Sequence, residues 1–146
     1  MLALVSGCFD PLHHGHLQYL RVAHRYVFRI PARCGTGTKI LCAVEPDADL
    51  EQRKQRPACL PAKTRAEIIR ALGFMDGVEI ATAYGVLATH HVDVFLKTVS
   101  WRGHLPPEII EICKERHTII KYLKLRHVAS STALLDAYCA KRLSRP

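Results

Sequence analysis

The chain alternates between short apolar segments and longer segments in which apolar residues recur at helical spacing. Five apolar segments have the length of buried strands: residues 2–5, 39–44, 77–80, 92–96 and 118–123. Helical spacing is found between them, in residues 17–23, 62–72 and 108–112. Pro106 and Pro107 suit the start of the third of these helices, and Ser130 opens a last one. The pattern indicates strands that alternate with helices.

Such alternation is typical of a parallel sheet that is covered by helices on both faces. We therefore expect an α/β fold, in which residues 1–146 form a single Rossmann-like, doubly wound domain with a five-stranded parallel sheet. The last helix should bury the side that carries Leu134, Leu135 and Tyr138, and residues 29–38 are loop-like. Ligands of these sheets bind beyond the carboxyl ends of the strands, so candidate residues should be sought there.

The composition excludes several classes of protein. Hydrophobic residues make up 49% of the 146 positions and charged residues 23%, as is ordinary for a soluble globular domain. No apolar run approaches the roughly 20 residues of a membrane span, and the N-terminus shows no secretory signal. We therefore expect a cytoplasmic protein that does not contact membranes. The six cysteines include no CxxC pair, which argues against a zinc framework or a disulfide framework.

The net charge of +8 is compatible with two kinds of ligand, nucleic acid and small phosphorylated molecules. No RNA-binding signature accompanies the charge, and aromatic residues make up only 7% of the chain. Because stacking platforms are scarce, we expect a small anionic ligand and no nucleic acid. Assembly as a homodimer is left open.

Residues 7–16, Gly-Cys-Phe-Asp-Pro-Leu-His-His-Gly-His, carry the strongest chemical signal. They connect the first predicted strand to a predicted helix, whose N-terminus offers unpaired N–H groups and a partial positive charge to an anion. Gly7 permits the turn, and Gly15 lets a phosphate approach the backbone. His13 and His16 are three residues apart and should face the same side. This segment suits a phosphoryl group, so we expect a nucleotide as ligand.

The same segment resembles the HxGH signature of the nucleotidyltransferase superfamily, in its cytidylyltransferase-like form. The nearest likeness is to heptose-phosphate adenylyltransferases and glycerol-3-phosphate cytidylyltransferases. The resemblance implies transfer of CMP or AMP, from CTP or ATP, to a phosphorylated sugar or polyol, with Mg²⁺ and with release of pyrophosphate. It makes His13 and His16 catalytic donors that stabilise charge in the transition state. It also implies a nucleotide site that contains Gly7, Cys8, Phe9, Asp10, His13, Gly15 and His16.

Metal binding by this loop has competing interpretations. Asp10 is its one carboxylate, which either binds Mg²⁺ on the triphosphate, orients a backbone amide or forms a turn with Pro11. Side chains of the zinc-ligand type also occur, at Cys8, His13, His14 and His16. The two adjacent histidines would point apart on a helix, and no second ligand cluster exists. We therefore predict that the protein itself holds no metal site.

Residues 129–132, Ala-Ser-Ser-Thr, resemble the second signature of the family. The resemblance implies that Ser130, Ser131 and Thr132 hold the β- and γ-phosphates at a helix N-terminus. A simple helix cap is the alternative. Coenzyme-forming branches carry an arginine three residues after the threonine, where this chain has Leu135. This difference argues against the pantetheine- and nicotinamide-handling branches.

Two cationic residues match the family in part. Lys54 lies in the charged run 51–57, where relatives carry a flexible lysine loop that reaches the phosphates. We assign Lys54 a catalytic role, with a merely solvated charge as the alternative. Arg65 matches an arginine at the start of the helix 62–72 and is assigned to nucleotide binding, with support of that helix as the alternative.

The segment after the fourth predicted strand matches the family less well. Lys97 and Trp101 agree with the family text, and Trp101 is assigned to the nucleotide pocket, with a place in the core as the alternative. Relatives have glycine and an acidic residue between them, where this chain has Thr98, Val99 and Ser100. The departure leaves open an altered acceptor pocket. It also leaves open a non-catalytic module of the same fold that binds or senses nucleotides.

Overall fold

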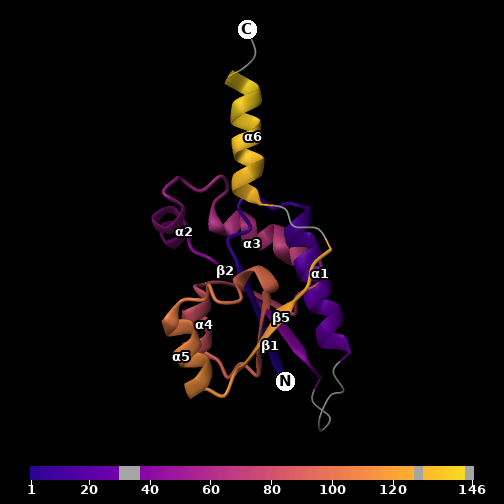
Figure 1. Cartoon of the computed structure of the whole chain (residues 1–146). Coiled ribbons are helices and arrows are strands. Elements are labelled where there is room, and N and C mark those ends of the chain that lie inside the picture. The colour runs from indigo at the N-terminus through magenta and orange to yellow at the C-terminus, as the bar shows by residue number, and fades with distance from the viewer. Residues whose placement is uncertain (30–36, 127–129, 144–146) are drawn as a thin grey trace.

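The computed structural model describes residues 1–29, 37–126 and 130–143. Within these residues the strands form a five-stranded parallel sheet in the order β3-β2-β1-β4-β5 (Figure 1). The strands are β1 (Leu2–Gly7), β2 (Lys39–Val44), β3 (Gly77–Ile80), β4 (Val94–Thr98) and β5 (Ile119–Leu123). The helices are α1 (His14–Phe28), α2 (Asp47–Lys54), α3 (Ala62–Ala71), α4 (Ala83–Thr89), the 3-10 turn η1 (Val99–Trp101), α5 (Pro107–Glu115) and α6 (Ser131–Leu143). The expected α/β fold is confirmed.

Helices cover both faces of the sheet, and each face has its own apolar cluster. Alternate strand residues such as Val5 and Cys42 pack against α1 and α3, while Leu4, Leu41 and Phe95 pack against α4 and α5. The central strands read as almost continuous apolar runs because both of their faces are buried. None of the helices in the described residues is long and apolar enough to cross a membrane.

The strand order reverses at β1, which pairs with β2 on one side and with β4 on the other. Val5 thus lies between Cys42 and Leu96 in the register of the sheet. The segments that leave the carboxyl ends of β1, β2 and β4 therefore meet at one edge, which is the usual position of a ligand site in this architecture.

The structure adds elements that the apolar pattern did not predict. Helix α2 occupies most of the segment expected to be a charged loop, and its one buried residue is Leu50. Helix α4 is seven residues long and contains Gly85, so it shows little periodicity. Most of the predicted loop 29–38 lies outside the described residues, as does Ala129.

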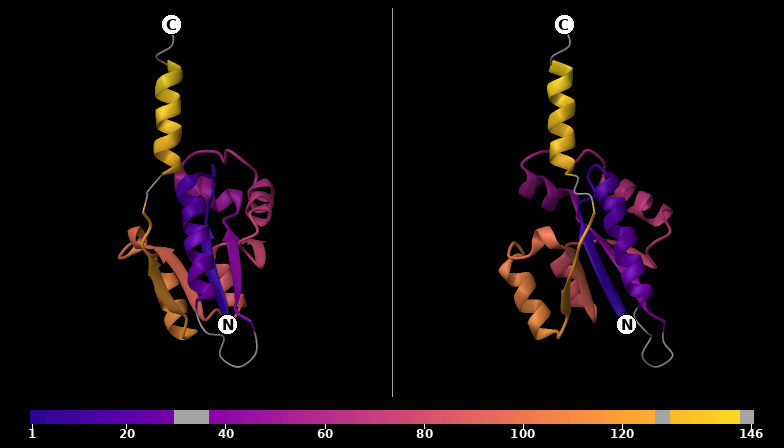
Figure 2. Two further views of the ribbon diagram at one scale, coloured as in Figure 1. Left: turned by 90° about the vertical axis from the view of Figure 1, so that its right-hand side faces the viewer. Right: turned by 45° about the vertical axis from the view of Figure 1, so that its right-hand side comes forward.

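The expectation of a buried side on the last helix is wrong. Leu134 and Tyr138 are 49% and 62% exposed, and Leu135 is only half-buried. Figure 2 shows the reason: α6 extends away from the sheet, so that beyond its first turn the body of the molecule does not cover it. The apolar spacing predicted the helix correctly but not its surroundings.

Candidate active site

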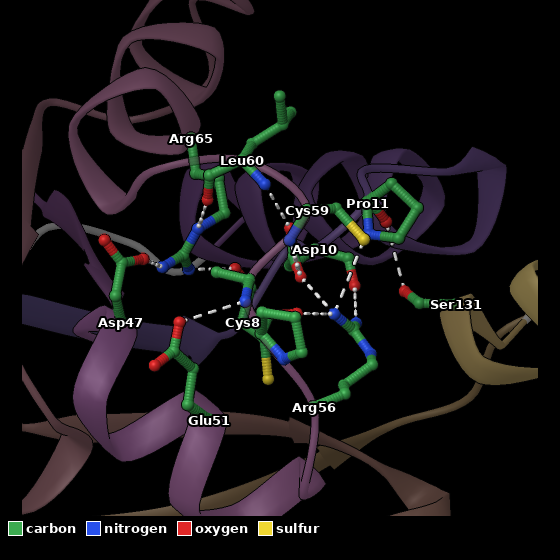
Figure 3. A network of polar contacts seen from close by, with 12 residues as sticks. Cys8, Asp10, Pro11, Asp47, Glu51, Arg56, Cys59, Leu60, Arg65 and Ser131 are labelled. Carbon is green, nitrogen blue, oxygen red and sulfur yellow. Dashed lines mark hydrogen bonds and ion pairs between the residues drawn. The ribbon is translucent and has the colours of Figure 1, made fainter.

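The loop that follows β1 is anchored by residues from far along the chain (Figure 3). Asp10 is buried, and its carboxylate accepts hydrogen bonds from the backbone N–H groups of Cys59 and Leu60 at 2.9 Å and from Arg56 at 2.8 Å. Burial opposes ionisation, but the bonds from Cys59, Arg56 and Leu60 outweigh it, so the pKa of Asp10 is lowered. Asp10 therefore fixes the loop, in agreement with the interpretation that it orients backbone amides.

Arg65 also holds this loop in place. Its side chain is fully buried and donates to the carbonyl oxygens of Cys8 and Leu60 and to the carboxylate of Asp47 (Figure 3). It is not among the residues that line the cavity described below. The geometry therefore favours the support role over the direct nucleotide contact to which Arg65 was assigned, because its donors already have partners.

Phe9 and Gly7 shape the turn. Phe9 adopts a left-handed backbone conformation, with φ of 54°, and its ring is buried. A side chain at Gly7 would place its Cβ 3.0 Å from the Phe9 ring, so the ring would have to shift by a few tenths of an ångström. The neighbouring ring therefore favours glycine here, in addition to any approach of a ligand.

His13 and His16 come together at the start of α1. His13 caps the helix, since its Nδ1 accepts hydrogen bonds from the N–H groups of Gly15 at 3.0 Å and His16 at 3.4 Å. The two rings are stacked, with centres 3.8 Å apart. The three-residue spacing thus places both rings on one side, as predicted. The prediction of unpaired N–H groups at the start of this helix is wrong for Gly15 and His16, because both donate to the ring of His13.

Both imidazoles are neutral at neutral pH. Burial lowers the pKa of His16 to about 3, helped by the neighbouring His13 and by the positive charge of Lys54. Burial and the charge of His14 also lower the pKa of His13. His13 uses Nδ1 as an acceptor, so its proton lies on Nε2, where it can be donated to a ligand. His16 keeps a buried Nδ1 for which the described part of the chain supplies no partner.

A cavity of about 1020 Å³ lies at the carboxyl edge of the sheet. The sequence-predicted residues among its lining are Gly7, Cys8, Phe9, Asp10, His13, Gly15, His16, Lys54, Trp101, Ser130 and Ser131. Lys54 is exposed at the end of α2 and is close enough to His16 to influence its pKa. Thr132 is exposed and, like Arg65, is not part of the lining.

Ser130 and Ser131 bring the start of α6 to the loop after β1. Ser131 donates to the carbonyl oxygen of Pro11 at 3.1 Å, and Ser130 accepts from the N–H of Ala133 at 3.5 Å. The loop after β1 and the start of α6 therefore meet at the cavity, although Pro11 and Ser131 are 120 residues apart in the sequence. Ser130 thus acts as a cap, as the alternative interpretation expected, and it also lines the cavity; its contact with a phosphate stays a prediction.

Trp101 lies between the cavity and the core. It is half-buried, lines the cavity and packs against the apolar cluster under α4 and α5. The ammonium group of Lys97 lies 4.3 Å from the centre of its ring, within the range of a cation–π contact.

Sequence reasoning did not identify a polar cluster formed by Cys8, Glu45 and Arg53. The thiol of Cys8 donates to Glu45 at 2.9 Å and accepts from Arg53 at 2.6 Å, and Arg53 also binds both oxygens of Glu45. Burial, followed by the hydrogen bond and charge of Glu45, raises the pKa of Cys8. Glu45 directly follows a predicted strand, and that position could have indicated it. Cys8, Glu45 and Arg53 line the cavity.

The cavity shows no protein-built metal centre. The described ranges contain no group of three or more histidine, cysteine, aspartate or glutamate side chains placed to share an ion. Asp10 already accepts three hydrogen bonds, and Arg53 and Cys8 occupy Glu45. These carboxylates therefore do not fit the role of free Mg²⁺ ligands.

Comparison with known proteins extends over most of the chain. FAD synthase of Pyrococcus abyssi is 35% identical over 77 residues, which is 53% of this chain and 45% of that protein. Bifunctional protein HldE of Proteus mirabilis is 29% identical over 144 residues, which is 93% of this chain and 27% of that protein. The chain thus spans less than half the length of these curated relatives.

A solved structure shares the fold. The lipopolysaccharide core biosynthesis protein of Thermoplasma volcanium superposes with a TM-score of 0.65 at 14% identity, covering 88% of this chain and 98% of that one. The cytidylyltransferase-like family matches residues 4–137, which include most of β1, the loop after it and strands β2 to β5. Because this match spans nearly the whole sequence, the chain belongs to the cytidylyltransferase-like family.

Proposed function

We propose that this protein is a nucleotidyltransferase. It transfers CMP or AMP, from CTP or ATP, to the phosphate of a small acceptor and releases pyrophosphate. The observation that carries the proposal is the pair of stacked, neutral histidines, which line one cavity together with Lys54, Ser130 and Ser131. Family membership and the relatives named FAD synthase and HldE support the same reaction class.

The chemistry follows from the donors that the site offers. An acceptor phosphate is already an anion, so its attack on the α-phosphorus needs no general base. Charge increases on the oxygens of the α-phosphate and on the departing pyrophosphate, and the N–H groups of His13 and His16 can donate to these oxygens. Lys54 adds an exposed positive charge at the end of α2, and the serine hydroxyls at the start of α6 offer further donors.

Mg²⁺ would enter this site with its substrate. It is usually held by substrate phosphates and by one or two carboxylates, and it keeps several waters. Asp49 and Glu108 are exposed carboxylates on the cavity wall that remain candidates, in place of Asp10. When bound, the ion would neutralise charge on the triphosphate.

Pyrophosphate release tests the proposal. The purified chain is incubated with CTP or ATP and with a panel of acceptors: heptose 1-phosphate, glycerol 3-phosphate and flavin mononucleotide. We expect release with at least one pair, and loss of release in His16→Ala. Binding of nucleotide with no release across the panel would favour the non-catalytic module. Absence of both binding and release would refute nucleotidyl transfer.

A further inference from the structure

Lys97, near the carboxyl end of β4, places an ammonium group at the cavity wall. The residue is only 7% exposed, and it belongs to the cavity lining. Its Nζ lies 3.4 Å from both the carbonyl oxygen and the hydroxyl of Ser6. These distances are long for hydrogen bonds from an ammonium group, which carries three donors. Lys97 therefore keeps unused hydrogen-bonding capacity.

The charge of Lys97 has no direct counter-charge. Lys97 forms no ion pair with any residue that the structure describes, whereas Arg53, Arg56 and Arg65 each bind a carboxylate. Glu45 is the carboxylate nearby, but Arg53 and the Cys8 thiol bind its oxygens. The rings of Trp101 and Phe95 contact the ammonium group, but neither carries a full negative charge. A buried cation without a counter-charge is unfavourable, so an anion from a ligand would stabilise it.

The position of Lys97 distinguishes it from the histidine pair. Residues two apart on a strand share a face, so Lys97 follows Phe95 onto the face covered by α4 and α5. The histidines belong to α1, which covers the opposite face. The cavity thus has donors on both sides of the sheet edge, and the side of Lys97 is flanked by the apolar residues Trp101, Leu105 and Ile109.

We propose that Lys97 binds the phosphate group of the acceptor and selects for acceptors that carry one. This inference rests on the proposed nucleotidyl transfer. Lys97 holds one oxygen of the acceptor phosphate while another oxygen of that group forms a bond to the α-phosphorus of the triphosphate. The bond from the α-phosphorus to the bridging oxygen breaks, and pyrophosphate leaves with the electron pair. No proton leaves Lys97 in this step.

The protonation of Lys97 makes anion binding measurable. Burial lowers the pKa of Lys97 to about 8; the charge of Arg53 acts in the same direction, and Cys8, Glu45 and Cys42 oppose it. A bound anion favours the ammonium form, so the protein should take up a proton when the anion binds. Uptake should approach about three-quarters of a proton per anion at pH 8.5 and nearly vanish at pH 6.5.

Calorimetry with sulfate provides a test that does not depend on turnover. Sulfate does not titrate in this pH range, so protons taken up must come to the protein. The chain is first saturated with an α,β-methylene analogue of CTP or ATP, and sulfate is then titrated in two buffers of different ionisation enthalpy. We expect the stated uptake in the wild type and a roughly 10- to 100-fold loss of sulfate affinity in Lys97→Met. Lys63→Met, on the exposed side of α3, is the matched control and should bind like the wild type.

The outcomes separate this inference from the proposed function. Equal sulfate affinity in Lys97→Met, or no pH-dependent uptake in the wild type, would overturn the role of Lys97 even if the nucleotide analogue binds. Failure of the analogue to bind would count against nucleotidyl transfer instead. With an acceptor from the panel, Lys97→Met should raise the KM for the acceptor at least tenfold and leave the KM for the triphosphate within about twofold. A rise in the triphosphate KM alone would place Lys97 on the nucleotide and refute the inference.

Discussion

His16 buries a ring nitrogen, Nδ1, that finds no partner within the described residues. Buried polar atoms without partners are rare in folded proteins, and each lowers stability by about 1–3 kcal/mol. The ring nevertheless stacks on His13 and contacts Phe9 edge-on, so its orientation is fixed. A side chain that is held in place at a cost in stability fits a role in ligand binding better than a role in folding.

Replacing His16 by alanine should separate these two roles. We expect His16→Ala to lower turnover by about 10²-fold or more, because one preorganised donor to the transition state is lost. The melting temperature should change by only a few degrees, since the lost packing is offset by removal of an unpaired nitrogen. Steady-state kinetics and thermal melts of both proteins check this. Near-wild-type turnover would remove His16 from the catalytic role.

The neutral state of His16 also predicts a pH dependence of stability. Its pKa is about 3 in the folded chain against an ordinary value of 6.5, so the unfolded chain binds an extra proton between these values. The free energy of unfolding should therefore be highest above pH 6.5 and fall as the pH drops, by up to ~1.4 kcal/mol per unit for this group. The free energy of unfolding, measured with urea from pH 5 to 7, should depend less steeply on pH in His16→Ala than in the wild type. The same pH dependence in both proteins would contradict the neutral state assigned to His16.

At the scale of elements, the loop after β1 derives its shape from the segment between α2 and α3. Arg56, Cys59 and Leu60 bind Asp10, and Arg65 binds the carbonyl of Cys8 (Figure 3). The histidines at the start of α1 follow this loop directly, so the same contacts position the cavity wall. Neighbouring cations in the run 51–57 therefore have different roles: Lys54 faces the cavity, whereas Arg56 supports the loop.

This difference predicts that substitutions of Lys54 and Arg56 affect different properties: the first affects turnover, and the second affects stability. Lys54→Ala should lower turnover with little change in melting temperature, because the side chain is exposed and acts on the ligand. Arg56→Ala leaves the buried Asp10 carboxylate short of one charged partner, which should lower stability by about 2 kcal/mol, or roughly 5 °C in the melting temperature. Equal loss of activity in both variants, reproduced by added salt, would indicate a general electrostatic field instead of a specific Lys54 contact.

The apolar pattern predicted the sheet because the strands are its most continuous signal. All five strands occur within two residues of their expected positions. Burial on both faces makes β1, β2 and β4 apolar runs, whereas the edge strands β3 and β5 are apolar although they are only partly buried. Helices α2 and α4 escaped detection for the opposite reason: α2 has one buried residue, and α4 is short and interrupted by Gly85. Periodicity detects a helix only when enough of its side chains are buried.

Local motifs predicted the cavity more fully than they predicted the supports around it. His13 and His16 belong to one motif, whereas the roles of Asp10 and Arg65 depend on partners far away in the sequence. A carboxylate in a glycine-bearing loop suggests a metal ligand until Arg56 and two backbone N–H groups are seen to bind it. Lys97 matched the family text without an assigned role, because only the fold shows that it is buried at the cavity wall.

For the whole molecule, the cavity joins the sheet edge to the first turn of α6, and the rest of that helix extends outward (Figure 2). An isolated helix of this length is marginal in water, because most helical stability comes from packing. Leu134 and Tyr138 are exposed, so packing contributes little here. Assembly as a homodimer stays a prediction. A ligand bound at its N-terminus would be a further source of stability for α6.

Triphosphate binding should therefore stabilise the molecule and α6 together. A ligand that binds only the folded chain stabilises it by about 2.7 kcal/mol at a hundred times its Kd, which corresponds to roughly 5–10 °C in the melting temperature. A phosphate beside Ser130 and Ser131 would also interact favourably with the dipole of α6 and slow its unfolding. We expect Mg²⁺ with CTP or ATP to raise the melting temperature and to slow amide hydrogen exchange in residues 131–143.

Matched ligands and variants distinguish this effect from general salt stabilisation. Cytidine and adenosine lack phosphates, so they should not slow exchange in residues 131–143. Ser131→Ala removes a hydroxyl at the helix start and should weaken the triphosphate effect on α6 more than it weakens exchange protection in the central strand β1. If the triphosphate protects β1 and leaves residues 131–143 unchanged, the start of α6 does not contact the phosphates. No thermal shift with either triphosphate at millimolar concentration would count against nucleotide binding altogether.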